Sequence, residues 1–575
     1  MNLGIFLDQA VARYNNQTFL HFYERTLSFS DFGQKVDSLA HGLKRLGFNK
    51  GDIVYVHLQN SPETLISYFA IQKIGAIAGP INGWWKGDEI KFLLNDSRGS
   101  GLIIEDQYLE TLQQIRPDCP HLKTVVQLGE HVAKEHISFD KLLAESQKKA
   151  FRCECDFRDI AYIFYTSGTT GKPKGVLLSH KNVLADIDGI TKALDFDPGM
   201  TVLCFLPLFH VNAMLTCSFC VGAGSPVVLR KGFSASEFWE VVDKYKVSFW
   251  SAVPAVYQIL LNDPSRQKHD LSSLKFGICG AAPLTKETMN QFEKAFQIPI
   301  VEGYGLTEAT CVSTINPRKG KRKIGSIGLP IPGQEIKIVD EEGNECEEKQ
   351  PGEILIKGDA VMGGYFERPE ETKATIKNGF LHTGDVGYKD EDGYIFIVDR
   401  KKDMIIRGGE NIYPKELDDL LATHPMISEA ATIGVPDKTM GEAVKVFVLP
   451  ANDALTEDEV LEFCKQKLAA YKVPQYVEIL KEDLPRNAIG KVLKKILKQW
   501  GIAPRPKKDG GGVTVEDIFG SMESRVNAKG VEGVTANYGY KITGTGGGEW
   551  TVSVKNGVVK VTTGIHEPNV TTTMA

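Results

Sequence analysis

YTSGTTGKPKGV, the stretch from Tyr165 to Val176, follows the apolar run AYIFY, which predicts a buried strand. Its glycines let backbone N–H groups approach an anion closely, while its hydroxyls and lysines add neutral and charged donors. The residues concerned are Gly168, Gly171 and Gly175, then Thr166, Ser167, Thr169 and Thr170, and finally Lys172 and Lys174. The spacing differs from that of GxxxxGK(S/T), because Pro173 stands where the second glycine would fall. We interpret the stretch as a triphosphate-binding loop, with a polar surface hairpin as the alternative.

Helix and strand signals alternate along the part of the chain around this loop. Asp31 is predicted to cap a helix whose apolar residues follow a helical period up to Gly47. A strand is predicted from Ile53, and Ser61 with Pro62 predicts the start of the next helix. Such alternation predicts parallel sheets covered by helices, so we expect a large α/β domain with several sheets over residues 1–401.

The rest of the chain divides further. Residues 402–500 contain the strand-like run AVKVFVLP and a capping box of Thr456 with Glu459, and we expect a small α+β domain there. Residues 501–512, GIAPRPKKDGGG, predict a flexible linker. Residues 513–575 show a helical start and then alternating strands, of which two are joined by a hairpin turn at Asn556-Gly557.

The composition excludes several classes of protein. A chain of 575 residues is too long for one compact core, and a net charge of −6 offers no basic excess for nucleic acid. The ten cysteines show no zinc-ligand spacing, and Cys217 and Cys220 lie in an apolar run, so we expect buried thiols in a reducing compartment. No signal peptide is visible, and the longest apolar stretch, Leu215 to Leu229, is too broken to cross a bilayer. We expect a cytoplasmic protein without a transmembrane segment.

Five further motifs follow the loop along the chain. They are GAAPL from Gly280, EGYGLTE from Glu302, HTGDVGY from His382, DRKKDMIIRGGENIYP from Asp399 and PRNAIGKVLKK from Pro485. With the loop, and in this order, they make about residues 1–500 resemble the adenylate-forming superfamily of acyl-CoA synthetases, firefly luciferases and peptide-synthetase adenylation domains. The resemblance implies that residues 402–500 form a mobile lid on the large domain.

The resemblance implies a nucleotide site. Tyr304 would stack on adenine, Asp385 would accept both ribose hydroxyls, and Arg400 would contact ribose and phosphate. The other nucleotide-binding residues would be Gly280, Ala281, Ala282, Glu302 and Gly303, and the phosphate-binding residues Thr166, Ser167, Gly168, Thr169, Thr170 and Lys174.

The resemblance also implies which residues act in catalysis. Lys491 would bridge the carboxylate of the acid and the α-phosphate, and Thr307 would contact the α-phosphate. Glu308 would hold Mg²⁺. The neighbouring Lys494 and Lys495 are expected to form a solvated face.

Three glycine and lysine positions would serve the second half of the reaction. Lys402 falls at the hinge of the lid, and Gly408 and Gly409 match the loop that lines the pantetheine tunnel of CoA. Glycine at these two positions would leave room for a narrow thiol chain. ATP, Mg²⁺ and CoA are therefore the expected cofactors and cosubstrates.

The acid is expected to meet PLFHVNAM, from Pro207 to Met214. His210 would wall off or orient the acid, and Asn212 lies nearby, although a lone histidine can equally be a packed core residue. No aspartate for a substrate amine is present here, which disfavours an amino acid. Trp250 is a candidate gate of the acyl pocket, with plain core packing as the alternative.

The segment EWTVSVKNGVVKV resembles the central hairpin of sterol-carrier-protein-like domains, so residues 513–575 are expected to be a partial α+β lipid-binding module. Such a module favours an apolar acid. We predict an ATP-dependent acyl-CoA ligase for a fatty or other apolar acid, with a homodimer as one expected state. Two alternatives stay open: an adenylating enzyme that loads a carrier protein, and a lipid carrier whose ligase part is degenerate.

Overall fold

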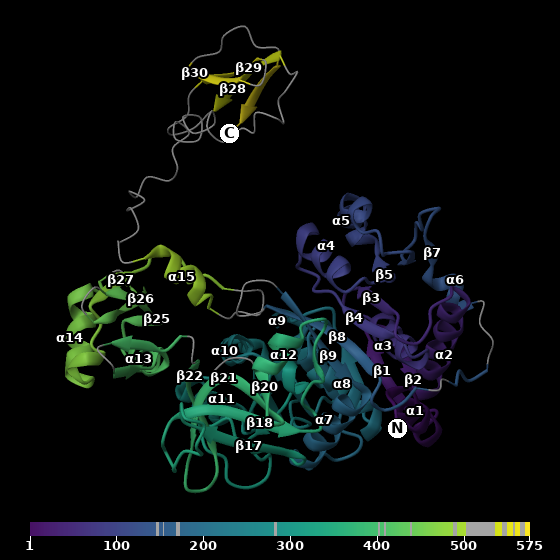
Figure 1. Ribbon diagram of the computed structural model, residues 1–575, viewed down its shortest axis with the longest axis horizontal. Coiled ribbons are helices and arrows are strands. Elements are labelled where there is room, and N and C mark those ends of the chain that lie inside the picture. The colour runs from purple at the N-terminus through teal and green to yellow at the C-terminus, as the bar shows by residue number, and fades with distance from the viewer. Residues whose placement is uncertain are drawn as a thin grey trace. The chain divides into compact units, whose positions relative to one another are not determined.

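The computed structural model describes most of the chain and divides it into two units, residues 1–494 and 495–575 (Figure 1). The described residues are 1–144, 149–152, 155–167, 173–280, 284–400, 403–407, 410–437, 440–452, 454–486, 492–501, 535–542, 549–555, 558–563 and 570–574.

An eight-stranded sheet, in the order β19-β9-β8-β4-β3-β5-β6-β7, holds the strands on both sides of the triphosphate-loop motif. The strands from β8 to β7 pair in parallel, whereas β8 and β9 pair antiparallel. Their bounds are β3 Ile53–His57, β4 Ile77–Pro80, β5 Gly101–Glu105, β6 Thr124–Leu128, β7 Ile137–Ser138, β8 Ile160–Ser167, β9 Pro173–Ser179 and β19 Gly364–Tyr365. On its outer face this sheet packs against α4 (Gly87–Asp96) and α5 (Leu109–Ile115).

A nine-stranded sheet, in the order β16-β15-β14-β13-β12-β10-β11-β1-β2, is parallel from β14 to β1. The bounds are β1 Thr18–Phe22, β2 Arg25–Ser28, β10 Val202–Cys204, β11 Val227–Leu229, β12 Phe249–Ala252, β13 Phe276–Cys279, β14 Ile300–Tyr304, β15 Thr314–Ile315 and β16 Leu329–Pro330. One face packs against α9 (Ala235–Tyr245), α10 (Pro254–Asn262) and α11 (Lys286–Phe296).

One large core joins the two sheets. It takes residues from the facing sides of both sheets and from the helices α1, α2, α3, α7 and α8. Their bounds, with that of the short α6, are α1 Leu3–Tyr14, α2 Phe29–Arg45, α3 Pro62–Lys73, α6 Phe139–Ala144, α7 His180–Ala193 and α8 Val211–Ala223. The parallel sheets with helical cover confirm the predicted fold class.

A third sheet is antiparallel and contains the HTGDVGY motif. It consists of β17 Gln334–Val339, β18 Gly352–Gly358, β20 Ile376–Lys377, β21 Phe380–Lys389 and β22 Ile395–Arg400, with α12 Pro369–Thr375 between β19 and β20.

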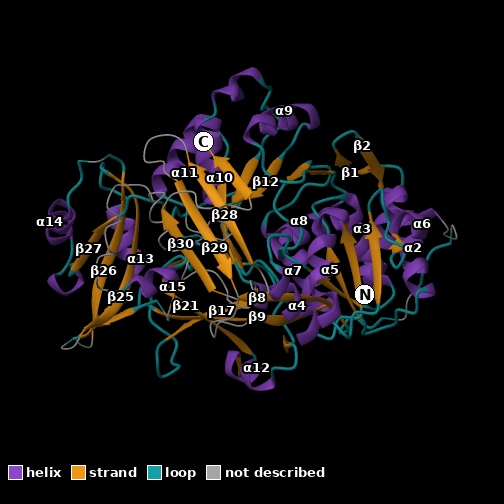
Figure 2. Ribbon diagram, turned by 90° about the horizontal axis from the view of Figure 1, so that it is seen from above, coloured by secondary structure: helices purple, strands orange, loops and turns teal. Residues whose placement is uncertain are grey.

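The last part of the first unit, from residue 403, has a sheet and a core of its own. Its strands are β23 Ile405–Arg407, β24 Glu410–Ile412, β25 Ile427–Asp437, β26 Gly441–Pro450 and β27 Tyr476–Ile479. Helices α13 (Pro414–Leu421) and α14 (Glu457–Lys467) pack on these strands, as Figure 2 shows, and α15 spans Lys494–Trp500. The strands pair antiparallel, except for β27, which pairs in parallel with β26; this mixture of helices and mainly antiparallel strands agrees with the predicted α+β lid.

The second unit contains a four-stranded sheet in the order β30-β29-β28-β31. The strands are β28 Thr535–Ile542, β29 Glu549–Lys555, β30 Val558–Thr563 and β31 Val570–Met574. β29 and β30 pair antiparallel with Lys555 opposite Val558, as expected for a two-residue hairpin. The resemblance to a lipid-binding module stays a prediction.

The helix caps were predicted with mixed success. Ser61 caps α3 with Pro62 in its first turn, and Thr456 forms the predicted capping box of α14. The cap at Asp31 is wrong: Ser28 is the N-cap of α2, and Asp31 is the acidic partner that completes its capping box. No helix in the described part of the chain is long and apolar enough to cross a membrane.

Candidate active site

The predicted triphosphate loop connects two paired strands. β8 ends at Ser167 and β9 begins at Pro173, with Thr166 opposite Lys174 in the antiparallel register. Gly168, Thr169 and Thr170 lie outside the described residues, as do Gly171 and Lys172. The described ends of the loop therefore place Lys174 beside Thr166, where the pairing brings the two predicted phosphate ligands together.

Lys174 already has an anionic partner. Its ammonium forms an ion pair with Glu371 of α12 and lies 5.2 Å from the centre of the Tyr365 ring. The Lys174 side chain is only 12% exposed. A buried ammonium held between a carboxylate and an aromatic face is poised to receive a stronger anion such as a triphosphate.

The GAAPL motif follows β13, and the EGYGLTE motif begins inside the neighbouring parallel strand β14 and continues beyond its end. A Cβ at Gly280 would lie 3.3 Å from the carbonyl oxygen of Gly303, so the two backbones approach closely. A Cβ at Gly305 would lie 1.6 Å from the carbonyl oxygen of Cys311, which restricts this position to glycine. Ligands of open α/β sheets bind beyond the carboxyl ends of such strands. Ala281 and Ala282 lie outside the described residues.

Two predicted nucleotide-binding residues from different sheets meet directly. The hydroxyl of Tyr304, at the end of β14, donates a hydrogen bond of 2.6 Å to Oδ2 of Asp385 in β21. Asp385 is buried, and in the β21–β22 register it lies opposite Arg400. The structure thus brings the predicted adenine and ribose residues together, as one nucleoside would require.

Thr307 and Glu308 form a short 3-10 turn, Thr307–Ala309, just after β14. The hydroxyl of Tyr365 donates a hydrogen bond of 3.0 Å to Oε1 of Glu308. Mg²⁺ in phosphoryl-transfer sites takes one or two carboxylates together with substrate phosphates. The Glu308 carboxylate, held by Tyr365 of β19 next to the phosphate-loop strand β9, fits that donor set.

Burial changes the titration of Glu302, the first residue of the EGYGLTE motif. Desolvation raises the pKa of Glu302 to about 7. The N–H groups of Gly325 and Leu284 and the charge of Lys415 lower the pKa, but by less. The N–H group of Gly325 lies 3.4 Å from Oε2 of Glu302. The carboxyl group therefore holds a proton more tightly in the folded protein than in the unfolded chain.

This shift predicts a pH dependence of stability. Because the folded pKa of Glu302 is raised from the ordinary value of 4.5, its contribution to the free energy of unfolding is fully present below pH 4.5 and falls until about pH 7. Glu302→Gln should remove this fall and gain about 2–4 kcal/mol over the wild type at pH 8, with little difference at pH 4. Urea unfolding of both proteins from pH 4 to 8 measures the difference. Parallel curves would contradict the assignment to Glu302.

The predicted acyl-pocket residues lie in two places: His210 and Asn212 at the start of α8, and Trp250 in a separate aromatic cluster. His210 is the N-cap of α8, and burial lowers its pKa to about 4, so its imidazole is neutral at physiological pH. Within the described structure, His210 Nε2 and Asn212 Oδ1 are buried without a hydrogen-bond partner. The ring of the half-exposed Trp84 lies 6.5 Å from that of His210. Two buried polar atoms without hydrogen-bond partners, close to an exposed aromatic ring, are consistent with a ligand site at His210.

Trp250 lies on the opposite face of the nine-stranded sheet. Its side chain is fully buried in an aromatic cluster with Phe238, Tyr257 and Phe292. Core packing, the alternative given for this residue, accounts for its position. Its role as a pocket gate stays a prediction.

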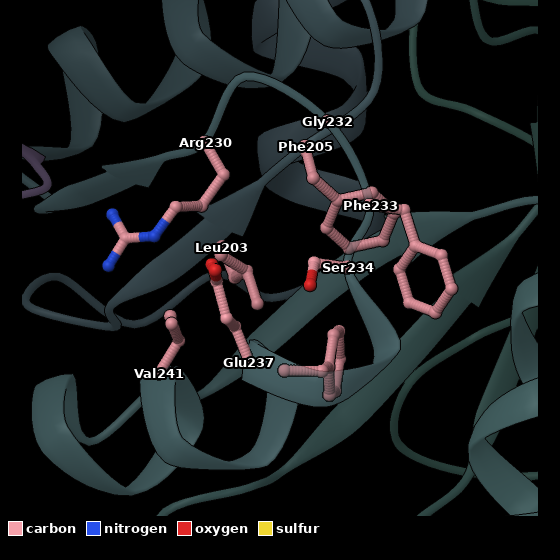
Figure 3. Close-up of a pocket in the computed structure, with 9 residues that line it drawn as sticks. Leu203, Phe205, Arg230, Gly232, Phe233, Ser234, Glu237 and Val241 are labelled. Carbon is pink, nitrogen blue, oxygen red and sulfur yellow. The ribbon is translucent and has the colours of Figure 1, made fainter.

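A small pocket on this same face contains none of the predicted site residues (Figure 3). It is lined by Leu203, Phe205, Arg230, Gly232, Phe233, Ser234, Glu237, Phe238 and Val241. The guanidinium of Arg230 points away from Phe205 and Phe233 and lies 4.9 Å from the centre of the Tyr23 ring. The pocket therefore shares no residue with the predicted site.

The lid segment contains one residue that the sequence interpretation misjudged. Lys494 is not part of a solvated face: its Nζ donates a 3.1 Å hydrogen bond to Oδ2 of Asp418 on α13. Burial acts to lower the pKa of Lys494, but Asp418 and Asp399 outweigh it, and the pKa is raised. Lys495 is exposed, as expected.

Other lid predictions lie outside the described residues. These are Lys402, Gly408, Gly409 and Lys491. The ion pair between Lys494 and Asp418 nevertheless holds Lys494, three residues beyond Lys491, against α13.

Sequence reasoning missed Tyr365 and Glu371. Both belong to the segment MGGYFERPEET, from Met362 to Thr372, in which two glycines precede a tyrosine and Pro369 opens a helix. That pattern reads as a turn followed by a helix start. Its contacts with Lys174 and Glu308 could not be read from local sequence.

The chain is similar to known protein families, to characterised relatives and to solved structures. Residues 7–366 match the family model described as AMP-binding enzyme, and residues 416–491 match the AMP-binding enzyme C-terminal domain. The chain is 38% identical over 523 residues to a long-chain-fatty-acid–CoA ligase of Bacillus subtilis, covering 85% of this chain and 93% of the relative. It is 34% identical over 463 residues to an oxalate–CoA ligase of Arabidopsis thaliana, covering 79% and 89%. The crystal structure of ATP-bound MatB from Rhodopseudomonas palustris superposes with a TM-score of 0.81 at 28% identity, covering 87% of this chain and 99% of that one.

The chain belongs to the family of AMP-binding enzymes. The comparisons confirm the predicted superfamily and the prediction of an ATP-dependent acyl-CoA ligase, an AMP-forming acid–thiol ligase.

Proposed function

We propose that this ligase activates a fatty or other apolar acid, and that the residues gathered at the ends of β8, β9, β13 and β14 carry the reaction. One observation carries the proposal: residues from separate motifs and sheets meet there, Tyr304 with Asp385 and Glu308 with Tyr365. The long-chain-fatty-acid–CoA ligase relative supports the choice of acid, whereas the oxalate–CoA ligase, of similar identity, shows that identity alone leaves the acid open.

The chemistry assigns a task to each group. A carboxylate oxygen of the acid attacks the α-phosphorus of ATP, and the bond to pyrophosphate breaks. Both reactants are anions, so Lys174 and Lys491 would offset their repulsion by charge placed in advance. Tyr304 and Asp385 would hold the nucleoside, and Thr307 would hold the α-phosphate. Mg²⁺, held by Glu308, would neutralise charge on the leaving pyrophosphate.

The second step would form the product. The thiol sulfur of CoA attacks the acyl carbonyl, AMP leaves, and the thiol proton passes to solvent. Because the acyl-adenylate is already activated, orienting the thiol is the main task of the protein. Gly408 and Gly409 would line the path of the thiol chain, and Lys402 would be the hinge between the two steps.

The acid is identified by a screen. Saturated acids from two to eighteen carbons, together with oxalate, malonate and benzoate, are each incubated with ATP, Mg²⁺ and CoA, and AMP and acyl-CoA are measured. We expect the highest kcat/KM for an apolar acid of more than six carbons. A preference for a dicarboxylic acid would contradict the proposed acid class. AMP formation without acyl-CoA would favour loading of a carrier protein, and no acid-dependent pyrophosphate release would favour a lipid carrier with a degenerate ligase part.

We also propose the domain bounds 1–401, 402–500, 501–512 and 513–575, a cytoplasmic location and a homodimer. The buried free thiols, among them Cys217 and Cys220, support a reducing compartment. Sedimentation of the purified protein tests the dimer.

A chain that ends at residue 500 should keep full acyl-CoA formation. Every motif assigned above lies before that point, and the contacts divide the chain near residue 494. The kcat and KM values of the shortened and complete proteins are compared on the preferred acid. A soluble shortened protein without activity would show that the tail is part of the ligase.

A further inference from the structure

The segment from Ala360 to Phe366 joins two motifs that lie far apart in the sequence. On one side, the N–H group of Phe366 donates to the carbonyl oxygen of Gly175 at 2.7 Å, and Tyr365 pairs with Val176 in the β19–β9 register. On the other side, the N–H group of Met362 donates to the carbonyl oxygen of Glu308 at 2.9 Å. The segment is thus held by backbone hydrogen bonds to the phosphate-loop strand and to the turn that bears Glu308.

The Tyr365 side chain contacts the same two motifs as the backbone of its segment. Its hydroxyl donates to Oε1 of Glu308 at 3.0 Å, and its ring faces the ammonium of Lys174 at 5.2 Å. A tyrosine hydroxyl carries its proton at physiological pH, so it can donate to the Glu308 carboxylate. Glu371, which pairs with Lys174, lies six residues after Tyr365 in the chain, in α12.

We propose that Tyr365 is a positioning residue that sets the orientation of the Glu308 carboxylate for a divalent cation and seats the Lys174 ammonium for the triphosphate. The proposal rests on the roles proposed for Glu308 and Lys174. Two separate contacts carry two separate tasks: the hydroxyl acts on the carboxylate, and the ring acts on the ammonium. A donor on one oxygen of a carboxylate fixes the plane of the group, and that plane sets the direction from which a cation or its bound water can approach.

A structural role is the competing explanation, because Tyr365 also packs against the main core. Loss of packing lowers thermal stability but leaves the dependence on Mg²⁺ unchanged. Loss of positioning changes the Mg²⁺ concentration at which the nucleotide binds. The two explanations therefore differ in a binding measurement that needs no acid.

The experiment follows thermal stabilisation of the complete chain by ATP, without acid or CoA, at Mg²⁺ concentrations from 10 µM to 20 mM. Tyr365→Phe removes the hydroxyl and keeps the ring. We expect it to raise the Mg²⁺ concentration for half-maximal stabilisation about three- to tenfold, as for the loss of one hydrogen bond. Tyr365→Leu removes the ring as well and should weaken ATP binding further, even at saturating Mg²⁺.

Tyr14→Phe is the matched control. The half-buried Tyr14 donates from its hydroxyl to the carbonyl oxygen of Gly222 at 3.1 Å, away from the strand ends that hold the site. This variant should lose a similar amount of thermal stability and keep the Mg²⁺ dependence of the wild type. In a Glu308→Gln background, the effect of Tyr365→Phe on Mg²⁺ should disappear, because both changes act on the same pair.

Each result decides a different claim. A Tyr365→Phe protein with the Mg²⁺ dependence of the wild type, at any change in melting temperature, overturns the positioning role and leaves the proposed function intact. A Mg²⁺ effect that persists in the Glu308→Gln background also overturns it, since the hydroxyl would then act elsewhere. If the wild type shows no Mg²⁺-dependent stabilisation by ATP, the roles proposed for Glu308 and Lys174 fail, and this proposal fails with them.

Discussion

Lys491→Ala is expected to slow the formation of acyl-adenylate about a hundred- to a thousandfold, as for the removal of one charge or donor placed in advance. The resemblance places this ammonium between the carboxylate and the α-phosphate, two anions that must approach each other. It also implies that the lid rotates before the second step and carries Lys491 away. The attack of CoA on acyl-adenylate should therefore be nearly unchanged in this variant.

Two assays separate the steps for Lys491→Ala. One supplies acid, ATP and Mg²⁺ and measures pyrophosphate; the other supplies synthetic acyl-adenylate and CoA and measures thioester. Lys495→Ala is the control, because Lys495 is an exposed lysine on the same segment. Lys494 is unsuitable, because its ion pair with Asp418 is largely buried. Equal slowing in both assays would show that Lys491 is not confined to adenylation, and slowing in neither would remove it from the mechanism.

Glu308→Gln is expected to reduce adenylation about a hundredfold or more while the fold is kept. The amide has the shape of the carboxylate, and its oxygen can still accept the Tyr365 hydroxyl that lies 3.0 Å from Oε1 of Glu308. Only the negative charge that a divalent cation requires is lost. The effect should appear in kcat and should decrease little when Mg²⁺ is raised.

The control for Glu308→Gln makes the same chemical change at the surface. Glu370→Gln alters a side chain on α12 that is 84% exposed, and it should leave adenylation unchanged. Melting temperatures of both variants test the fold. A folded Glu308→Gln protein with the turnover of the wild type would exclude Glu308 from the metal site.

The sequence predicts the helix starts and strands well where the signal is local. Pro62 after Ser61 identifies the first turn of α3, because proline fits only where its missing N–H is not needed. Local sequence predicts the start of α2 at Asp31, whereas the N-cap is Ser28, because both residues of a capping box are good helix caps and local sequence does not rank them.

Contacts between segments that are distant in the sequence could not be predicted from local sequence patterns. The Tyr365–Glu308 hydrogen bond depends on the register of β19 against β9, two strands that lie far apart in the sequence. The burial of Lys494 depends on Asp418, which is 76 residues away. Local sequence does not contain this partner, so a lysine-rich helix predicts a solvated face. The residues implied by the family resemblance, such as Tyr304 and Asp385, were found because motifs preserve long-range partners that composition does not reveal.

The pairing of β1 with β11 has a consequence for synthesis of the chain. Leu20 lies opposite Val227 in a parallel register. The ribosome therefore makes β11, the partner of β1 on this side, 207 residues after Leu20. At about 5–20 residues per second, the ribosome needs roughly 10–40 s to make that stretch. During this time Phe19 and Leu20, which end fully buried, lack the strand that completes their sheet. We therefore expect the nascent N-terminal segment to expose an apolar strand of the kind that chaperones bind, well before the nucleotide site is complete.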